Sequence, residues 1–192
     1  MIAVGSWTFL ALSPPFIVES SPTIRLLHSL TRELVKGHFN GNYHGVPNGA
    51  RLKDLRPGDV ILLHNQNGAY GYWTHAVLYV GGGKAIDAND FSRGTILSPM
   101  PGYLTYDELS VFRPQISAFQ KQQVVQSALQ KLGYPYNPFA PIQDQHSEYC
   151  SKLVWHAFHD SGVQLCPAYQ WVLPDDLAHS KVLHQVADWK HG

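Results

Sequence analysis

A cysteine at the predicted start of a helix is the residue whose position best suggests chemistry. Cys150 opens the segment 150–158, in which apolar residues recur at helical spacing. A thiol in the first turn of a helix lies beside unpaired backbone N–H groups and the positive end of the helix dipole, which favour the thiolate. The same N–H groups can stabilise an oxyanion that forms beside the sulfur. Cys150 is therefore either a nucleophile or a buried structural cysteine.

A cysteine nucleophile needs a base, and His75 and Asp87 are the candidates for the base and its orienting group. His75 opens a predicted strand, and Asp87 lies on the next one. The glycine turn 81–83 lies about midway between them, so the two side chains are predicted to face each other across a hairpin. Asp87 would bond one ring nitrogen of His75 and leave the other for Cys150. Taken singly, they are better explained as a strand histidine and a loop-capping carboxylate.

Hydrophobic periodicity and turn residues predict an α+β fold, in which a small antiparallel sheet packs against helices. Helices are expected over residues 22–36, 117–132 and 150–162, with a short one starting at Pro174. Strands are expected over residues 60–63, 74–80, 85–88, 95–97, 109–113 and 182–186. Helix 117–132 is expected to turn four residues inward: Phe119, Val124, Ala128 and Leu132. Pro99 and Pro101 are expected to end the fourth strand.

Residues 1–50 are interpreted as an N-terminal arm and helix packed on a catalytic domain of residues 51–192. Residues 1–19 are fairly apolar but contain no Lys or Arg, which makes a poor signal peptide and favours a packed strand or arm. No segment reaches the length of a membrane span, so no stable membrane anchor is expected. The place where the protein acts is left open by these features.

The composition argues against several classes of partner. The formal net charge of the 192 residues is zero, and no basic stripe predicts nucleic-acid binding. The two cysteines, Cys150 and Cys166, do not make a disulfide framework. A zinc site of Cys150, His156 and His159 is conceivable, but their spacing does not place all three on one helix face. No metal or cofactor is therefore expected.

Four motifs carry a family resemblance when they are taken in order. They are Leu55–Ile61, His75–Gly81, Ile86–Ala88 and Tyr149–Val154. Together they resemble the circularly permuted branch of the NlpC-type papain-like cysteine hydrolases, which includes YiiX-like proteins and the lecithin:retinol acyltransferase group. In ordinary NlpC-type enzymes the cysteine helix precedes the histidine strand, and here the order is reversed. The resemblance covers roughly residues 55–177 and implies a permuted papain-like fold.

The resemblance assigns roles by position. Cys150 matches the nucleophile, His75 the base, and Asp87 the third polar residue, which is often His or Glu in the family. Tyr136 matches a tyrosine whose hydroxyl lies near the nucleophile and the oxyanion, and Ser151 matches a serine that helps to bind substrate. Tyr136 is equally explained as an aromatic residue packed under its loop, and Ser151 as an ordinary first-turn residue.

The leading functional hypothesis is a thiol hydrolase that cleaves amide bonds in peptidoglycan stem peptides. Delivery as an antibacterial effector, for example by type VI secretion and with an immunity protein as partner, would reconcile wall chemistry with the poor signal peptide. A lipid acyltransferase or thioesterase is an alternative, although those relatives usually have His at the position of Asp87 and many have a membrane anchor. A catalytically silent binding module is the third possibility.

Overall fold

The computed structural model describes residues 47–190, so the helix expected over 22–36 and most of the N-terminal arm lie outside the described residues. The strands are β1 (Val60–His64), β2 (His75–Gly81), β3 (Lys84–Asp90), β4 (Gly94–Pro99), β5 (Glu108–Pro114) and β6 (Leu183–Lys190). The α-helices are α2 (Ala118–Leu129), α3 (Cys150–His159) and α4 (Pro174–Ala178). Two 3₁₀ helices are η1 (Leu52–Asp54) and η2 (Met100–Thr105).

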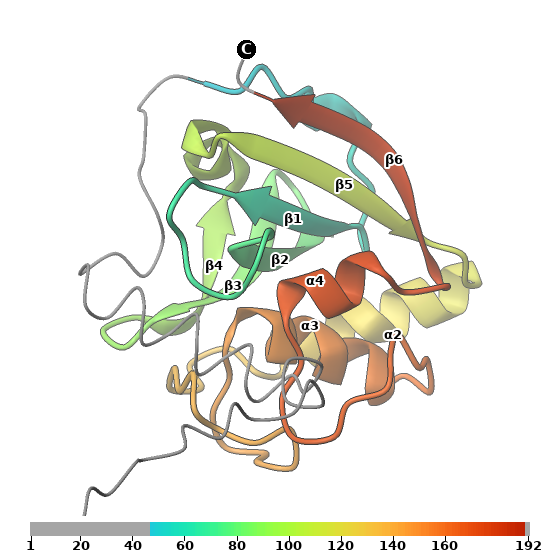
Figure 1. The fold of residues 1–192 in the computed structure, drawn as a ribbon. Coiled ribbons are helices and arrows are strands. Elements are labelled where there is room, and N and C mark those ends of the chain that lie inside the picture. Colours follow the sequence, from blue (N-terminus) through green and yellow to red (C-terminus); the bar gives the residue numbers. More distant parts are fainter. Residues whose placement is uncertain (1–46, 191–192) are drawn as a thin grey trace, which may run out of the picture.

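One sheet organises the described part of the chain. Its strand order is β4-β3-β2-β1-β5-β6, and every neighbouring pair is antiparallel. Figure 1 shows the three α-helices gathered together on one side of this sheet. The expected α+β class, with a small antiparallel sheet packed against helices, is confirmed. Among the described residues, no helix is long and apolar enough to cross a membrane.

Both faces of the sheet are covered. Its inner strands are apolar at successive positions, as expected for strands that are buried on both faces. One core cluster joins alternate residues of the central strands, such as Leu62 and Leu78, to the apolar side of α3. A second cluster joins the intervening residues, such as Ile61 and Val77, to the tyrosines of the η2 region. Every position of α3 from Cys150 to Phe158 is buried, so the helix that carries the candidate nucleophile is central to the core.

The segment after β4 forms a 3₁₀ helix. Pro99 ends the pairing, as expected, and residues 100–105 then form η2. A proline is tolerated early in a helical turn because its missing N–H has no helical partner there. This turn brings Tyr103 into the second core cluster, with 5 % of its surface exposed.

The inward face of α2 was also predicted incorrectly at two positions. Val124 and Ala128 are buried, but Phe119 is 68 % exposed and Leu132 is 40 % exposed. Phe119 and Ala128 are separated by about 180° around an α-helix of 3.6 residues per turn, so they cannot share a face. Leu132 has the right spacing from Ala128, but the helix ends at Leu129, before that position is reached.

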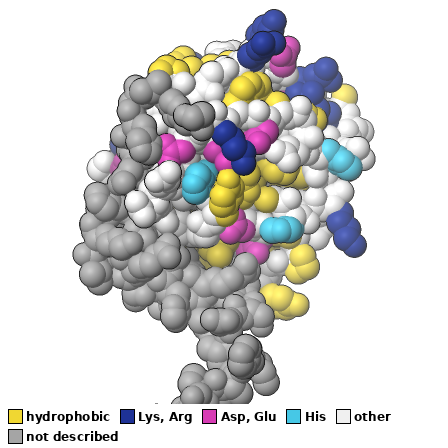
Figure 2. Space-filling model, turned by 45° about the horizontal axis from the view of Figure 1, so that its top comes forward, with side chains coloured by type: hydrophobic (Ala, Val, Ile, Leu, Met, Phe, Trp, Pro, Cys, Tyr) yellow, Lys and Arg dark blue, Asp and Glu magenta, His cyan; other side chains and the backbone are white. Residues whose placement is uncertain are grey.

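Charge is mixed over the surface. Figure 2 shows Lys and Arg side chains next to Asp and Glu on the face that it turns toward the viewer, with hydrophobic side chains between them. This arrangement matches the balanced composition, in which 14 basic residues are offset by 14 acidic ones.

The corrected face of α2 predicts unequal effects of two truncations on stability. Val124→Ala removes buried methyl groups and should lower the free energy of unfolding by roughly 1–3 kcal/mol. Phe119→Ala removes a ring that is mostly in solvent and should change it by about 0.5 kcal/mol or less. Urea unfolding followed by circular dichroism measures both. A larger loss from Phe119→Ala than from Val124→Ala would contradict the orientation of α2.

Candidate active site

Cys150 is the first residue of α3, as the sequence predicts. Tyr149 before it is extended, with φ −131° and ψ 166°, and its carbonyl accepts the first helical hydrogen bond from Leu153 at 2.9 Å. The thiol therefore lies beside first-turn N–H groups that have no partner within the helix. Cys150 is only 2 % exposed, so a reacting carbonyl must reach the sulfur within an almost closed site.

His75 and Asp87 meet in the structure. The His75 Nε2 atom lies 2.9 Å from Asp87 Oδ1, and His75 is 7 % exposed while Asp87 is fully buried. The pairing is diagonal and not directly opposite as the hairpin argument supposed. Leu78 pairs with Ile86, and continuing this register places Asp87 opposite Val77. The register Leu78–Ile86 is centred on residue 82, whereas His75 and Asp87 are centred on residue 81, so the two side chains are offset by two positions. A diagonal neighbour is still within reach of an imidazole.

The Asp87 carboxylate is held by further donors. Its Oδ2 atom accepts hydrogen bonds from the Tyr103 hydroxyl and the Asn89 amide, both at 2.9 Å, which leaves Oδ1 facing His75. Burial opposes the charge, but the charge of His75 and the hydrogen bonds from its three neighbours outweigh burial and lower the pKa of Asp87. The carboxylate is therefore ionised and fixed in orientation.

The His75 ring is set between Asp87 and Cys150. Burial works against its charged form, but the negative charge of Asp87 and hydrogen bonds with Asp87 and Cys150 raise the pKa of His75 well above its ordinary value of 6.5. Since Nε2 faces Asp87, Nδ1 is the nitrogen left for the thiol. The ring also stacks on Tyr106, with centroids 6.2 Å apart and planes 11° apart. These contacts favour an imidazolium beside the sulfur.

Tyr136 lies in the same neighbourhood and is paired with a residue that the sequence did not single out. Its hydroxyl lies 3.0 Å from the hydroxyl of Tyr70. Burial and the charge at Cys150 raise the pKa of both phenols, so both remain protonated. Tyr136 is tied to the segment before Cys150, because it forms a parallel bridge with Glu148. The only local sign of Tyr70 was an aromatic residue followed by a glycine in a turn.

Ser151 has a structural contact in this arrangement. Its hydroxyl is buried and donates a 2.9 Å hydrogen bond to the Val172 carbonyl, and it lies 4.0 Å from the Cys150 Sγ atom. This bond holds the segment before α4 against the start of α3. Substrate binding by Ser151 stays a prediction that rests on the resemblance.

The histidines of α3 have other partners. His156 Nδ1 lies 2.8 Å from Glu148 Oε1, and its Nε2 lies 2.8 Å from the Ile142 carbonyl. His159 stacks on Trp155 with centroids 4.5 Å apart. Within residues 47–190, no group of three or more His, Cys, Asp or Glu is arranged to hold a metal ion. Cys166 is a free thiol whose pKa is raised to about 12 by burial and by the charge of Asp176.

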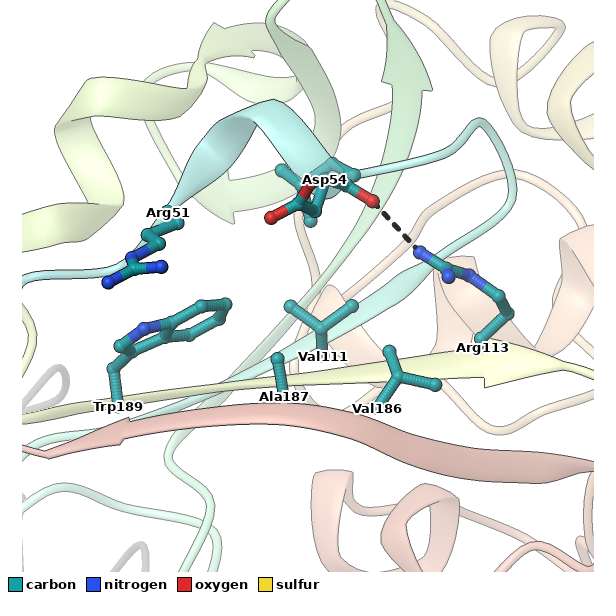
Figure 3. A pocket seen from close by; sticks show the side chains of 8 residues that line it. Arg51, Asp54, Val111, Arg113, Val186, Ala187 and Trp189 are labelled. Carbon is teal, nitrogen blue, oxygen red and sulfur yellow. Dashed lines mark hydrogen bonds between the residues drawn. The ribbon is translucent and has the colours of Figure 1, made fainter.

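A surface pocket lies apart from these residues. Figure 3 shows it between η1 and strands β5 and β6. Its volume is about 260 Å³. Val111, Val186 and Ala187 form its apolar floor, and the Arg51 guanidinium lies over Trp189 at one end. None of the residues lining this pocket contributes to the Cys150 site, so we assign it no part in the chemistry.

Asp87→Asn should slow acylation of Cys150 by roughly ten- to a thousand-fold, less than His75→Ala, because a cysteine thiolate depends on its base less than a serine does. The alkaline limb of the rate–pH profile should also shift to lower pH, since the carboxylate that raises the pKa of His75 is gone. Release of nitrophenol from a p-nitrophenyl ester measures both.

Asp90→Asn is the matched control for this change. Asp90 lies at the end of the same strand, but its carboxylate is partly exposed and bonds Ser92 and Arg93. Its replacement should leave the acylation rate unchanged. An Asp87→Asn variant that matches the wild type at every pH would reduce the proposed triad to a Cys150–His75 dyad.

Comparison with known proteins agrees with the fold and the order of the motifs. Residues 54–186 match the family model described as "Permuted papain-like amidase enzyme, YaeF/YiiX, C92 family". The crystal structure described as metalloprotein yiiX from Escherichia coli O157:H7 is similar at a TM-score of 0.58 and 17 % identity, covering 71 % of this chain and 97 % of that one. No curated protein sequence gives a significant match. The resemblance to the permuted papain-like group is confirmed, and the chain belongs to the YaeF/YiiX family of permuted papain-like amidases.

Proposed function

We propose that this protein is a thiol-dependent amidase that cleaves amide bonds in peptidoglycan stem peptides. The observation that supports the chemistry most directly is the His75 ring, whose Nε2 atom lies 2.9 Å from Asp87 Oδ1 and whose pKa is raised by Asp87 and by Cys150, the first residue of α3. A nucleophile, a base and an orienting carboxylate thus occur in sequence along one line of contacts.

In the proposed reaction, the Cys150 thiolate attacks the amide carbonyl carbon and forms a tetrahedral oxyanion. The His75 imidazolium donates its Nδ1 proton to the amide nitrogen, the C–N bond breaks, and the amine leaves. A thioester between Cys150 and the acyl group remains. Neutral His75 then takes a proton from water as the water attacks the thioester, and collapse of the second tetrahedral intermediate releases the carboxylic acid and restores the thiolate.

The raised pKa of His75 suits the first half of this cycle. An imidazolium that persists at neutral pH is ready to protonate a leaving amine, which is a poor leaving group without that proton. Asp87 is buried and ionised, so it compensates the ring's charge in both halves of the reaction. The first-turn N–H groups of α3 are suitably placed to stabilise the oxyanion.

The substrate class is inferred from the resemblance to NlpC-type hydrolases and from aromatic side chains near the site. Phe91 is 69 % exposed and packs edge-on against Tyr136, with ring centroids 5.2 Å apart. Phe139, three residues after Tyr136, is 55 % exposed. Exposed rings beside a polar site offer apolar contact to residues that flank the cleaved bond.

A lipid acyl donor is the second candidate, and the same exposed rings favour it because they would also contact an acyl chain. The two candidates differ in the intermediate that they leave on Cys150. Mass spectrometry after incubation with phosphatidylcholine vesicles would detect a fatty-acyl mass on the Cys150 peptide if the lipid candidate is correct.

Purified protein should release soluble peptide fragments from peptidoglycan sacculi, and Cys150→Ala should abolish the release while the circular dichroism spectrum is unchanged. Cys166→Ala is the matched control, because that thiol is half-buried and its high pKa keeps it protonated. It should retain nearly full activity. Sacculi left intact by the wild type after long incubation would contradict the substrate, and activity in Cys150→Ala would contradict the nucleophile.

An effector role gives a separate prediction. Expression directed to the periplasm of a Gram-negative host should be toxic, whereas cytosolic expression should have little effect, because stem peptides are assembled into the wall outside the cytosol. Colony counts after induction measure this, with Cys150→Ala as the control. Equal toxicity from both compartments would contradict an effector that acts on the wall.

A further inference from the structure

Strand β3 has a bulge two residues after Asp87. Its pairing with β4 passes from Ala88 to Asp90 while β4 advances by a single residue, so Asn89 is an extra residue that the pairing skips. Bulges are frequent beside active sites, where they change the direction of one side chain. Here the Asn89 side chain turns back along its own strand, and its Nδ2 atom donates a 2.9 Å hydrogen bond to Asp87 Oδ2.

The orientation of the Asn89 amide is fixed from both of its ends. An ionised carboxylate only accepts hydrogen bonds, so the amide must turn its NH₂ group toward Asp87. A guanidinium only donates, and the Arg93 Nη2 atom donates to the amide oxygen, Asn89 Oδ1. Both neighbours therefore require the same orientation of this amide.

The turn between β3 and β4 holds Arg93 for this contact. The Arg93 side chain is 55 % exposed, and its Nε atom donates to Asp90 Oδ2 at 2.8 Å. The other oxygen of Asp90 accepts hydrogen bonds from the backbone N–H groups of Ser92 and Arg93, both at 2.9 Å. A guanidinium presents its donors in a rigid planar fork, so fixing Nε also directs Nη2 toward Asn89.

The same hairpin is fixed to the loop that follows α2. The Thr95 N–H donates to the Tyr134 carbonyl at 2.8 Å, and the Gly133 N–H donates to the Thr95 carbonyl at 2.9 Å. Gly94 has a φ of +63°, and a Cβ atom there would lie 2.4 Å from the Tyr134 carbonyl oxygen, so only glycine allows this close approach. The turn that carries Arg93 is therefore anchored at its base.

We propose that Asn89 and Arg93 are positioning residues for Asp87, and that Arg93 acts through the Asn89 amide. This rests on the proposed thiol chemistry, in which Asp87 orients His75. The contacts run in sequence from an exposed guanidinium to Asn89, then to Asp87, and then to the His75 ring. Burial raises the pKa of Asp87, and the contacts with His75, followed by the hydrogen bond from Asn89, lower it.

Asn89→Ala should slow acylation of Cys150 by roughly three- to thirty-fold, because a hydrogen bond to a charged group is lost. Arg93→Met should slow it by roughly two- to ten-fold, and a substitution at this exposed position seldom disturbs folding. Arg93→Lys keeps a donor for the Asn89 oxygen and should recover part of the rate. Release of nitrophenol from a p-nitrophenyl ester measures each rate.

Ser92→Ala is the matched control in the same turn. The Ser92 hydroxyl donates to Asp90 Oδ1, and within the described residues it forms no hydrogen bond with Asn89 or Asp87. Its replacement should leave the acylation rate unchanged. Asp90→Asn should also leave the rate unchanged, because an amide still offers an oxygen to the Arg93 guanidinium.

The proton between His75 and Asp87 gives a readout that is specific to positioning. Both side chains are buried, so the ¹H resonance of this proton should be visible by nuclear magnetic resonance through its coupling to ¹⁵N-labelled His75 Nε2. Without the Asn89 donor, the Asp87 carboxylate keeps more negative charge and attracts this proton more strongly. Asn89→Ala and Arg93→Met should therefore both move the resonance downfield, and Ser92→Ala should leave it in place.

A double variant tests whether Arg93 acts through Asn89. If it does, adding Arg93→Met to the Asn89→Ala variant should change neither the acylation rate nor the resonance any further. If the guanidinium acts on Asp87 by its charge alone, Arg93→Met should have the same effect with and without Asn89→Ala. That result would overturn the connection through the amide.

The outcomes separate this proposal from the proposed function. A wild-type Cys150 that does not react with iodoacetamide would contradict the thiol chemistry, while the His75 resonance would still report on positioning. Normal alkylation of the wild type, together with an unchanged rate and an unchanged resonance in Asn89→Ala, would overturn the positioning role. A wild type that shows no resonance for a proton between His75 and Asp87 would overturn it as well.

Discussion

The buried contact between His75 and Asp87 is the interaction on which the rest of the site depends. Both side chains alternate with strand residues that pack toward the helices, so they lie on the other sheet face. His75 is the first residue of β2, and Cys150 contributes to its raised pKa. Burying an unpaired charge is costly, so a carboxylate with no exposed surface requires its partner and its two further donors.

The same pair makes the stability of the fold depend on pH. The raised pKa of His75 stabilises the fold at pH below 6.5, and this contribution is lost as the pH rises through the folded value. Lowering the pKa of Asp87 stabilises it above 3.8, and that contribution is lost as the pH falls through the folded value.

Packing of α3 in the core fixes the position of the nucleophile, Cys150. Since α3 is buried along almost its whole length, its first turn cannot shift without disturbing the core. Glu148 fixes the loop before α3 to the helix. Its side chain contacts His156 at 2.8 Å, and its backbone forms hydrogen bonds with the backbones of Pro135 and Asn137 at 2.9 Å. The loop bearing Tyr136 and the helix bearing Cys150 are therefore held by one residue. A site assembled from distant segments keeps its geometry because each segment is anchored in the core.

Local patterns predicted most of the elements, and tertiary contacts decided the rest. The strand that begins at His75 and the helix that begins at Cys150 follow from periodicity and turn residues, which are local properties. The diagonal pairing of His75 with Asp87 depends on a hairpin register centred on residue 82 and not on residue 81, a one-residue difference that the glycine turn does not reveal. Tyr103 and Tyr70 reach the site through a 3₁₀ turn and a strained loop that is held by Asp175, 105 residues after Tyr70. No sequence period marks such residues, because their partners are remote in the chain.

The central claim is that His75 is an imidazolium held between Asp87 and Cys150. The most direct measurement is a pH titration of the ¹⁵N-labelled His75 ring by nuclear magnetic resonance, with the resonance assigned from its absence in His75→Ala. The account predicts that both ring nitrogens stay protonated at pH values well above 6.5, and that the titration moves to lower pH in Cys150→Ala because the thiol's contribution is lost. A His75 ring that becomes neutral at or below 6.5 in the wild type, with no response to Cys150→Ala, would contradict the account.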